Sequence, residues 1–293
     1  MVQAVIIGPG AIGLCMGAAL MQAGHAVTFA ARQGFDTLKM TKTGSDPVTW
    51  PAEVVTAPDA VKDAPDWVFL CVKTHQVAGA ADWLRAAVGE RTRVAILQNG
   101  VEHAERVAPW VKAGTPLVPV VIDLPAVRPA AGEVVWHSRA LMTVADTDNG
   151  RDLCALFAGS FLTARASADY VTENWKKLCM NAPSGAITAL TGQPMGVLHR
   201  PGIAAIVQAL LEECVAVGRA EGADLPDTLI PQQMEAFLAE DPQAGNSMYE
   251  DWKAGRETEW DARNGVIVRK GKAHGIATPV STLLVPLLAA QRP

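Results

Sequence analysis

The sequence lacks an excess of positive charge, and it lacks long uninterrupted apolar runs. Its 293 residues carry a formal net charge of −5 at pH 7. Nucleic-acid-binding domains normally show a basic patch, so we expect no nucleic-acid partner. Charged residues or several glycines interrupt every apolar run before it reaches membrane-spanning length, so we expect no membrane partner. A strand and a helix account for the apolar residues nearest the N-terminus, and we therefore expect no signal peptide there.

Cysteine is also scarce, and none of the five cysteines has C-x-x-C spacing. They lie far apart in apolar segments, at Cys15, Cys71, Cys154, Cys179 and Cys214. Without paired spacing we expect no zinc or redox site built from cysteine, and the histidines and carboxylates form no metal motif either. We predict buried free thiols in a cytoplasmic protein that holds no metal.

The most informative pattern lies in the first 32 residues. The apolar run Ala4–Ile7 is typical of a buried strand, and Ala11–Ala23 has apolar residues at helical spacing. Between them lies Gly8-Pro9-Gly10-Ala11-Ile12-Gly13, and His25–Ala30 predicts a second strand. A strand, a G-x-G-x-x-G turn, a helix and a strand in this order predict a dinucleotide-binding site. A purely structural glycine turn is the alternative.

The three glycines have separate roles in that site. Gly8 allows the tight turn, Gly10 lets the backbone approach a pyrophosphate, and Gly13 lets helix and strand pack closely. About 20 residues further on, where an NAD site usually has Asp or Glu, the chain has Arg32. A guanidinium matches a 2′-phosphate, so we predict NADP(H) as the cofactor and Arg32 as the residue that selects it. An ordinary solvated arginine is the alternative.

Two further predicted strands deliver polar residues to one edge of the sheet. Asp66–Val72 is followed by Lys73, and Val94–Gln98 is followed by Asn99-Gly100. Open α/β sheets bind ligands at the carboxyl ends of their strands. Asn-Gly is also a common turn, and its spacing alone favours a structural role for Asn99.

After residue 100 the pattern changes from strands to helices. Leu117–Ile122, Gly132–His137 and Ala140–Ala145 predict strands with no long helix between them, so we expect the sheet to finish with antiparallel strands. Gly159–Ala168 contains a last extended piece. Helical periodicity then dominates, in Val171–Leu190, Ile203–Gly222, Thr228–Leu238, Trp252–His274 and a final helix with Thr278 as its cap and Pro279 in its first turn.

These patterns predict an α/β fold in two domains. Residues 1–167 would form an N-terminal Rossmann-type doubly wound sheet, and residues 168–293 an all-helical C-terminal domain that forms a homodimer by analogy with similar folds. In the first of its helices, Lys177 and Asn181 are four residues apart and share a face. Taken alone, Lys177 and Glu259 are more often solvated surface residues than site residues.

Taken together, motifs along the whole chain resemble the ketopantoate reductase family. They run in order and with similar spacing from residue 2 to about residue 285. They are Gly8-Pro9-Gly10-Ala11-Ile12-Gly13, Arg32, Lys73-Thr74-His75-Gln76, Gln98-Asn99-Gly100, Trp175-Lys176-Lys177-Leu178 with Asn181, Asn246-Ser247-Met248, Thr258-Glu259 and Lys272-Ala273-His274-Gly275-Ile276-Ala277-Thr278-Pro279. Each motif is modest alone, whereas the ordered set is specific.

The resemblance implies NADPH-dependent reduction of the 2-oxo group of 2-dehydropantoate to pantoate, a step in pantothenate biosynthesis. Lys177 resembles the general acid that protonates the ketone oxygen as hydride reaches C2, and Glu259 resembles its partner. Asn99 resembles the residue where nicotinamide and substrate meet, and Lys73 resembles a lysine on the cofactor side. Asn99 is expected to contact both substrate and cofactor, and Glu259 is expected to contact the cofactor as well as to act in catalysis. The groups implied to hold the substrate hydroxyl and carboxylate are Asn181 and Ser247.

Two positions do not fit the family's pattern simply. A second asparagine usually lies one turn beyond Asn181, and this chain has Gly185 there. Ser184 could take over its hydrogen bond, or the pocket could be larger, so a reductase of another branched 2-oxo acid stays open. A dinucleotide-binding sensor without catalysis is the alternative from another class of protein.

The second position is Asn264-Gly265. Local rules predict a turn there, but the resemblance places these two residues inside a long helix, and we follow the resemblance.

Overall fold

The computed structural model describes residues 1–291, which divide into two compact units. The first unit comprises Met1–Gln98 and His103–Tyr170, and the second comprises Asn99–Glu102 and the described chain from Val171 onward. The last two residues of the predicted helical domain, 292–293, lie outside the described chain. The short segment Asn99–Glu102 therefore belongs with the helices, although it lies among strands in the sequence.

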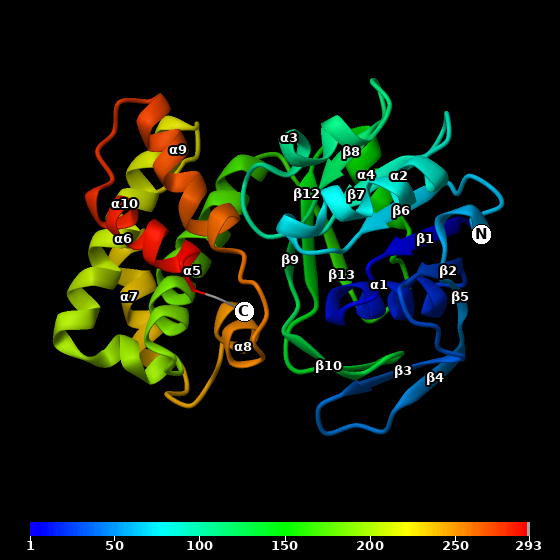
Figure 1. Ribbon diagram of the computed structural model, residues 1–293, viewed down its shortest axis with the longest axis horizontal. Helices are drawn as coiled ribbons and strands as arrows, with labels where there is room; N and C mark the ends of the chain where they lie inside the picture. The colour runs from blue at the N-terminus through cyan, green and yellow to red at the C-terminus, as the bar shows by residue number, and fades with distance from the viewer. Residues whose placement is uncertain (292–293) are drawn as a thin grey trace. The chain divides into compact units, whose positions relative to one another are not determined.

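The first unit is built on a parallel sheet of six strands, in the order β5-β2-β1-β6-β7-β8 (Figure 1). Renumbered along the chain from one to six, these strands lie in the order 3-2-1-4-5-6, the usual order of a doubly wound dinucleotide-binding sheet. The predicted fold class is thus confirmed. The strands are β1 Gln3–Ile7, β2 Ala26–Ala30, β5 Glu53–Val55, β6 Trp67–Leu70, β7 Arg93–Ile96 and β8 Leu117–Pro119.

The prediction that this sheet finishes with antiparallel strands is wrong. Strand β8 pairs in parallel with β7, and the strands after β8 belong to two separate sheets, of which the first, β10-β11-β3-β4, also contains two earlier strands and the second has the order β13-β12-β9. Apolar periodicity reveals a strand but not the sheet that it joins. The bounds are β3 Thr37–Lys42, β4 Val48–Pro51, β9 Val121–Asp123, β10 Ala126–Ala130, β11 Glu133–Trp136, β12 Leu141–Ala145 and β13 Thr163–Ser167.

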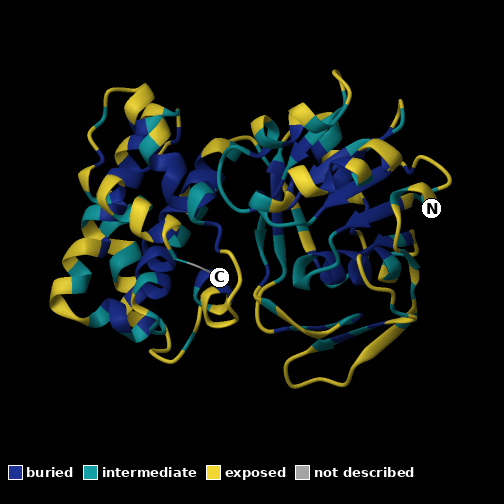
Figure 2. Ribbon diagram, viewed as in Figure 1, coloured by how far each residue is buried: buried dark blue, intermediate teal, exposed yellow. Residues whose placement is uncertain are grey.

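Helix α1 (Ala11–Gln22) is buried along most of its length, as Figure 2 shows by its dark blue colour. It packs against β1 and β2 and also against β3, β10 and β11 of the four-stranded sheet. Because two sheets cover it, the helix needs no polar face, which explains why its apolar residues continue around it. The other helices of this unit are α2 Ala81–Ala87, α3 His103–Val107 and α4 Asp148–Ala155.

All five cysteines are free thiols, as predicted. Cys71 and Cys154 are partly exposed, however, so the prediction of full burial is wrong for these two. Burial raises the pKa of the Cys15 thiol to about 12, so this thiol stays protonated at neutral pH. The Cys179 thiol donates a hydrogen bond to Cys214 Sγ at 3.4 Å.

The second unit is made of helices. They are α5 Tyr170–Thr191, α6 Pro201–Ala220, α7 Leu229–Ala239, α8 Ser247–Lys253, α9 Val266–Ala273 and α10 Pro279–Ala289. Among the described residues, α6 alone is long and apolar enough to cross a membrane. It carries the consecutive carboxylates Glu212 and Glu213 and packs against α7, α9 and α10, as a core helix does.

The prediction of one continuous helix over Trp252–His274 is wrong. Helix α8 ends at Lys253, Gly255 follows with φ +63°, and a π-helical turn at Asp261–Gly265 leads into α9. A glycine in this conformation is a common helix stop, so the signal was present in the sequence. Asn264-Gly265 lies in the π-helical turn, which agrees with its predicted helical placement.

Buried Glu213 on α6 caps the N-terminus of α10. Its carboxylate oxygens accept hydrogen bonds from the backbone N–H groups of Val280 and Ser281, at 2.6 and 2.8 Å. Thr278 precedes the helix and Pro279 begins it, as predicted, but within residues 1–291 the Thr278 side chain makes no capping hydrogen bond. The carboxylate instead satisfies the first backbone donors and faces the positive end of the helix.

We expect Glu213→Ala to lower the free energy of unfolding by about 2–4 kcal/mol, because two backbone donors lose their acceptor. Glu212→Ala is the matched control, since Glu212 is exposed on the same helix, and it should change stability by less than about 0.5 kcal/mol. Urea unfolding of both variants measures the difference. Equal losses would show that the cap contributes no more than a surface residue.

Candidate active site

The turn between β1 and α1 has the geometry that the glycine motif predicts. Gly8 has φ +86°, and a Cβ there would lie 2.6 Å from Val72 Cγ1. A Cβ on Gly13 would lie 2.5 Å from the Gly8 carbonyl oxygen. Both positions therefore require glycine, the first for its conformation and the second for close packing.

Gly10 borders open space at the start of α1. No heavy atom of the described chain lies within 4 Å of a Cβ built on this residue. Within residues 1–291, no side chain caps the helix that follows. An uncapped helix start offers backbone N–H donors and the positive end of the helix dipole, which suit a phosphate. The turn thus fits a dinucleotide.

Two cationic residues follow the strands on either side of this turn. Strands β2 and β6 pair with β1 from opposite sides, and Arg32 and Lys73 follow their carboxyl ends. Lys73 comes directly after Val72, the residue that a Cβ on Gly8 would meet. The backbone N–H of Lys73 donates to Gln76 Oε1 at 3.2 Å. Arg32 is exposed. Positive charge on both sides favours an anionic ligand at the turn.

In the second unit, a chain of polar contacts joins four of the predicted site residues. Asn181 Nδ2 donates to Asn99 Oδ1 at 3.3 Å, and Asn99 Nδ2 donates to Glu259 Oε2 at 2.7 Å. Arg263 Nη2 lies 3.8 Å from the same Glu259 oxygen and donates to Ser247 Oγ at 2.6 Å. Hydrogen-bond partners as far as 160 positions apart along the chain are therefore held together in one network.

Glu259 and Arg263 form a buried ion pair, and sequence reasoning missed the arginine. Both side chains are 2% exposed, so Glu259 is no solvated surface residue. Burial lowers the pKa of Arg263, while the charges of Glu259 and Asp251 oppose that shift. An arginine keeps its proton in proteins, so a fixed positive charge stands beside Glu259. The available signal was the spacing of four residues, which puts both side chains on one helix face.

Two family models match the chain. The model described as ketopantoate reductase PanE/ApbA matches residues 4–149, and its C-terminal counterpart matches residues 169–292. A curated 2-dehydropantoate 2-reductase from Caulobacter vibrioides is 44% identical, over 99% of both chains. This chain belongs to the ketopantoate reductase family.

Other similarities support membership of the ketopantoate reductase family. A 2-dehydropantoate 2-reductase from Mycobacterium tuberculosis is 36% identical over 97% of this chain and 96% of its own. The crystal structure of a PanE/ApbA family ketopantoate reductase from Ralstonia eutropha has a TM-score of 0.88 at 30% identity, covering 98% of this chain and 97% of the other. The chain is thus an oxidoreductase of this family.

Two more distant structures share the fold alone. One is a dimeric ketopantoate reductase from Staphylococcus aureus, with a TM-score of 0.88 at 23% identity, covering 99% of this chain and 98% of that one. The other is D-mandelate dehydrogenase with NADH and anilino(oxo)acetate, with a TM-score of 0.85 at 23% identity and the same coverage. The ketopantoate reductase fold therefore also occurs in a dehydrogenase of a different name.

Lys177, the residue that resembles the family's general acid, lies on α5 and is half-buried. It precedes Asn181 by four residues, so it shares a helix face with the first member of the contact network. The Ser184 hydroxyl donates its proton to the backbone carbonyl of Met180 at 2.7 Å, so only its oxygen lone pairs are left for another partner. The space beside Gly185 is occupied by the side chains of Met248 and Arg263, which come from other segments of the chain.

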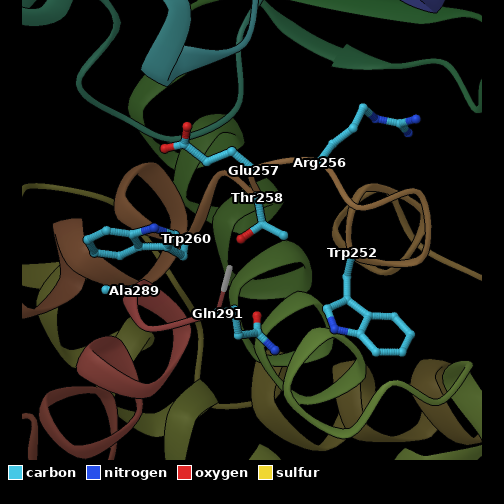
Figure 3. A pocket seen from close by; sticks show the side chains of 7 residues that line it. All are labelled: Trp252, Arg256, Glu257, Thr258, Trp260, Ala289 and Gln291. Carbon is cyan, nitrogen blue, oxygen red and sulfur yellow. The ribbon is translucent and has the colours of Figure 1, made fainter. Parts of the chain in front are cut away.

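A small pocket in the second unit lies outside this network. Its volume is about 210 Å³, and Figure 3 shows the rings of Trp252 and Trp260 on either side of Thr258. Apart from these three, its lining residues are Arg256, Glu257, Ala289 and Gln291. None of the predicted site residues lines it, although Glu259 directly follows Thr258 in the sequence. The pocket is therefore separate from the predicted ketopantoate reductase site.

Proposed function

We propose that this chain reduces 2-dehydropantoate to pantoate with NADPH, in pantothenate biosynthesis. The observation that carries the proposal is the network of Asn181, Asn99 and Glu259, which Arg263 extends to Ser247 and which groups residues that the family resemblance assigns to one site. The names of the relatives that are 44% and 36% identical supply the substrate. Lys177, one helical turn before Asn181, is the proposed general acid.

NADP(H) is the proposed cofactor, and it supplies the hydride when bound. The glycine turn Gly8–Gly13 would hold its pyrophosphate, with Lys73 beside it, and Arg32 would bind the 2′-phosphate. Asn99 and Glu259 are the proposed contacts near the nicotinamide. The choice of NADP over NAD rests on Arg32. The fold alone does not determine the cofactor, because D-mandelate dehydrogenase has the same fold and was solved with NADH.

The chain's own residues have distinct tasks in the proposed reaction. The Lys177 ammonium group would give a proton to the ketone oxygen and stabilise the negative charge that develops there. A carboxylate nearby favours the charged form of a lysine, which is the proposed task of Glu259. Asn99 is oriented by its two hydrogen bonds, and the proposed substrate contacts are Asn181 and Ser247.

A steady-state assay of NADPH oxidation with 2-dehydropantoate, beside a panel of 2-oxo acids and repeated with NADH, tests the proposal. We expect a clear preference for 2-dehydropantoate and NADPH. No oxidation with any acid would overturn the proposal in favour of a sensor. Activity confined to another acid would retain the proposed Lys177 mechanism and replace the substrate.

A reductase for another branched 2-oxo acid is the second candidate, and Gly185 favours it. This residue stands where the family's pattern has an asparagine, and the nearest atoms to a Cβ on it belong to Met248 and Arg263. An arginine and a methionine packed beside position 185 give this region different chemistry from an amide side chain there. The same panel of acids distinguishes the two candidates.

We also infer a cytoplasmic homodimer. Free thiols suit a reducing compartment, and the five cysteines are all free. Helix α10 exposes Leu283 and Leu287 four residues apart, which gives an apolar strip for association. The Staphylococcus aureus reductase of the same fold is described as dimeric.

Gly100→Ala should weaken the proposed site by moving Asn99. Gly100 has φ +96°, and a Cβ there would lie 2.6 Å from the backbone oxygen of Ala262. Losing the hydrogen bond from Asn99 to a charged group should lower kcat/KM by about 10- to 100-fold. The measurement is the steady-state assay with 2-dehydropantoate.

Gly114→Ala is the matched control for this variant. Gly114 also has positive φ, +84°, but no heavy atom of the described chain lies within 4 Å of a Cβ built on it. Both variants carry the strain of the left-handed conformation, whereas only Gly100→Ala displaces the loop next to Ala262. If both lose activity equally, the position of Asn99 is not the cause.

A further inference from the structure

Gly185 and Arg263 are spatial neighbours, although 78 positions separate them in the sequence. A Cβ on Gly185 would lie 3.3 Å from Arg263 Nη1 and 2.8 Å from Met248 Sδ. An asparagine side chain at position 185 would therefore meet the guanidinium. The absence of a side chain on Gly185 thus makes room for both Met248 and Arg263 in their observed positions.

The guanidinium reaches two residues of the proposed site from this position. Its Nη2 donates to Ser247 Oγ at 2.6 Å and lies 3.8 Å from Glu259 Oε2. Because the Ser247 oxygen accepts this bond, its own O–H is directed toward a further acceptor, and a substrate carboxylate is such an acceptor. The positive charge also offsets the cost of burying the Glu259 carboxylate.

Burying the charged Arg263 side chain costs free energy of desolvation, so its presence in the protein interior calls for an explanation. The side chain is 2% exposed, and within residues 1–291 its Nε has no hydrogen-bond partner. An apolar side chain of similar volume often replaces a buried ion pair without loss of stability. Stability alone therefore does not explain why an arginine stands at position 263.

We propose that Arg263 is a positioning residue that replaces the missing side chain at position 185. It directs the Ser247 hydroxyl and holds the Glu259 carboxylate, and it thereby sets the affinity of the site for the carboxylate of a 2-oxo acid. This inference rests on the proposed function. It makes Gly185 and Arg263 a matched pair, so that a change at one alters the effect of a change at the other.

A double-mutant cycle with Arg263→Met and Gly185→Ala tests the pairing. The readouts are the KM for 2-dehydropantoate, the Kd for NADPH and the unfolding midpoint. We expect Arg263→Met to raise this KM by about 10- to 100-fold, the loss typical of a hydrogen bond to a charged group, with the Kd for NADPH within about twofold of wild type. Gly185→Ala alone should also raise the KM, because its Cβ meets Arg263 Nη1 at 3.3 Å as well as Met248 Sδ at 2.8 Å. The contact with Met248 persists in the Arg263→Met background, whereas the part of the effect that passes through Arg263 should disappear there.

Arg263→Lys separates charge from shape. A lysine keeps the charge but lacks the planar fork, so we expect a KM between those of wild type and Arg263→Met. If Arg263→Met does not fold, the KM values of Arg263→Lys and Gly185→Ala decide the question. A wild-type KM in these variants, or independent effects of the two positions that add, would overturn the proposal.

The proposed function can fail separately from this inference. Titration of 2-dehydropantoate into the wild-type protein with NADP⁺ measures binding without reduction. Absence of binding and of turnover in the wild type would refute the proposed substrate. Binding in the wild type that the Arg263 variants leave unchanged would refute only the role of Arg263.

Discussion

Lys177→Ala should lower kcat for 2-dehydropantoate by about 10³-fold or more, while the Kd for NADPH stays within about twofold of wild type. The variant removes both the proton donor and the positive charge next to the ketone oxygen in the proposed reaction. Lys177 lies in the helical unit, whereas the glycine turn that fits the cofactor lies in the other. Steady-state kinetics and NADPH fluorescence titration measure the two quantities.

Lys176→Ala is the matched control for this loss. Lys176 is the preceding residue on α5 and is exposed, while Lys177 is half-buried. The control variant should keep kcat within about twofold of wild type, because a surface charge contributes little. Near-normal turnover in Lys177→Ala would refute the proposed general acid.

Arg32→Glu should lower the preference for NADPH over NADH by about 100-fold or more. The variant removes charge-assisted hydrogen bonds to the 2′-phosphate, and it places a carboxylate where it repels that phosphate and accepts from a ribose hydroxyl. The ratio of kcat/KM for the two cofactors, measured with the same 2-oxo acid, gives the preference.

The control for charge is Arg91→Glu, which makes the same change elsewhere in the first unit. Arg91 is exposed and precedes β7, at the amino end of a strand, whereas Arg32 follows the carboxyl end of β2. We expect no change in cofactor preference for Arg91→Glu. A similar shift in both variants would mean that net charge, and not the position of Arg32, determines the preference.

Local patterns were sufficient to predict the dinucleotide-binding part of the fold. The strand, glycine turn and helix at the N-terminus lie next to one another in the sequence, and each glycine fills a local steric need. Buried parallel strands such as β6 are apolar on both faces, which makes them visible as continuous runs. Later strands such as β11 and β12 were also visible as short apolar runs, but the sheets that they join were not.

Contacts between distant segments could not be predicted from local patterns. Asn99 follows a strand of the first unit and yet belongs with the helices, where it bonds to Glu259. Glu213 replaces Thr278 as the cap of α10 from 67 positions away. The four-residue spacing from Glu259 was the one local signal for Arg263, and the sequence does not show that this arginine lies beside Gly185 and donates to Ser247.

Transfer of a labelled hydride tests the central claim most directly. NADPH that carries deuterium at the transferred position of C4 is incubated with the protein and 2-dehydropantoate, and the product is analysed by mass spectrometry. The account predicts pantoate with one deuterium at C2, and no such product from Lys177→Ala in the same time. Oxidation of the cofactor without deuterium in pantoate, or no consumption of 2-dehydropantoate, would contradict it.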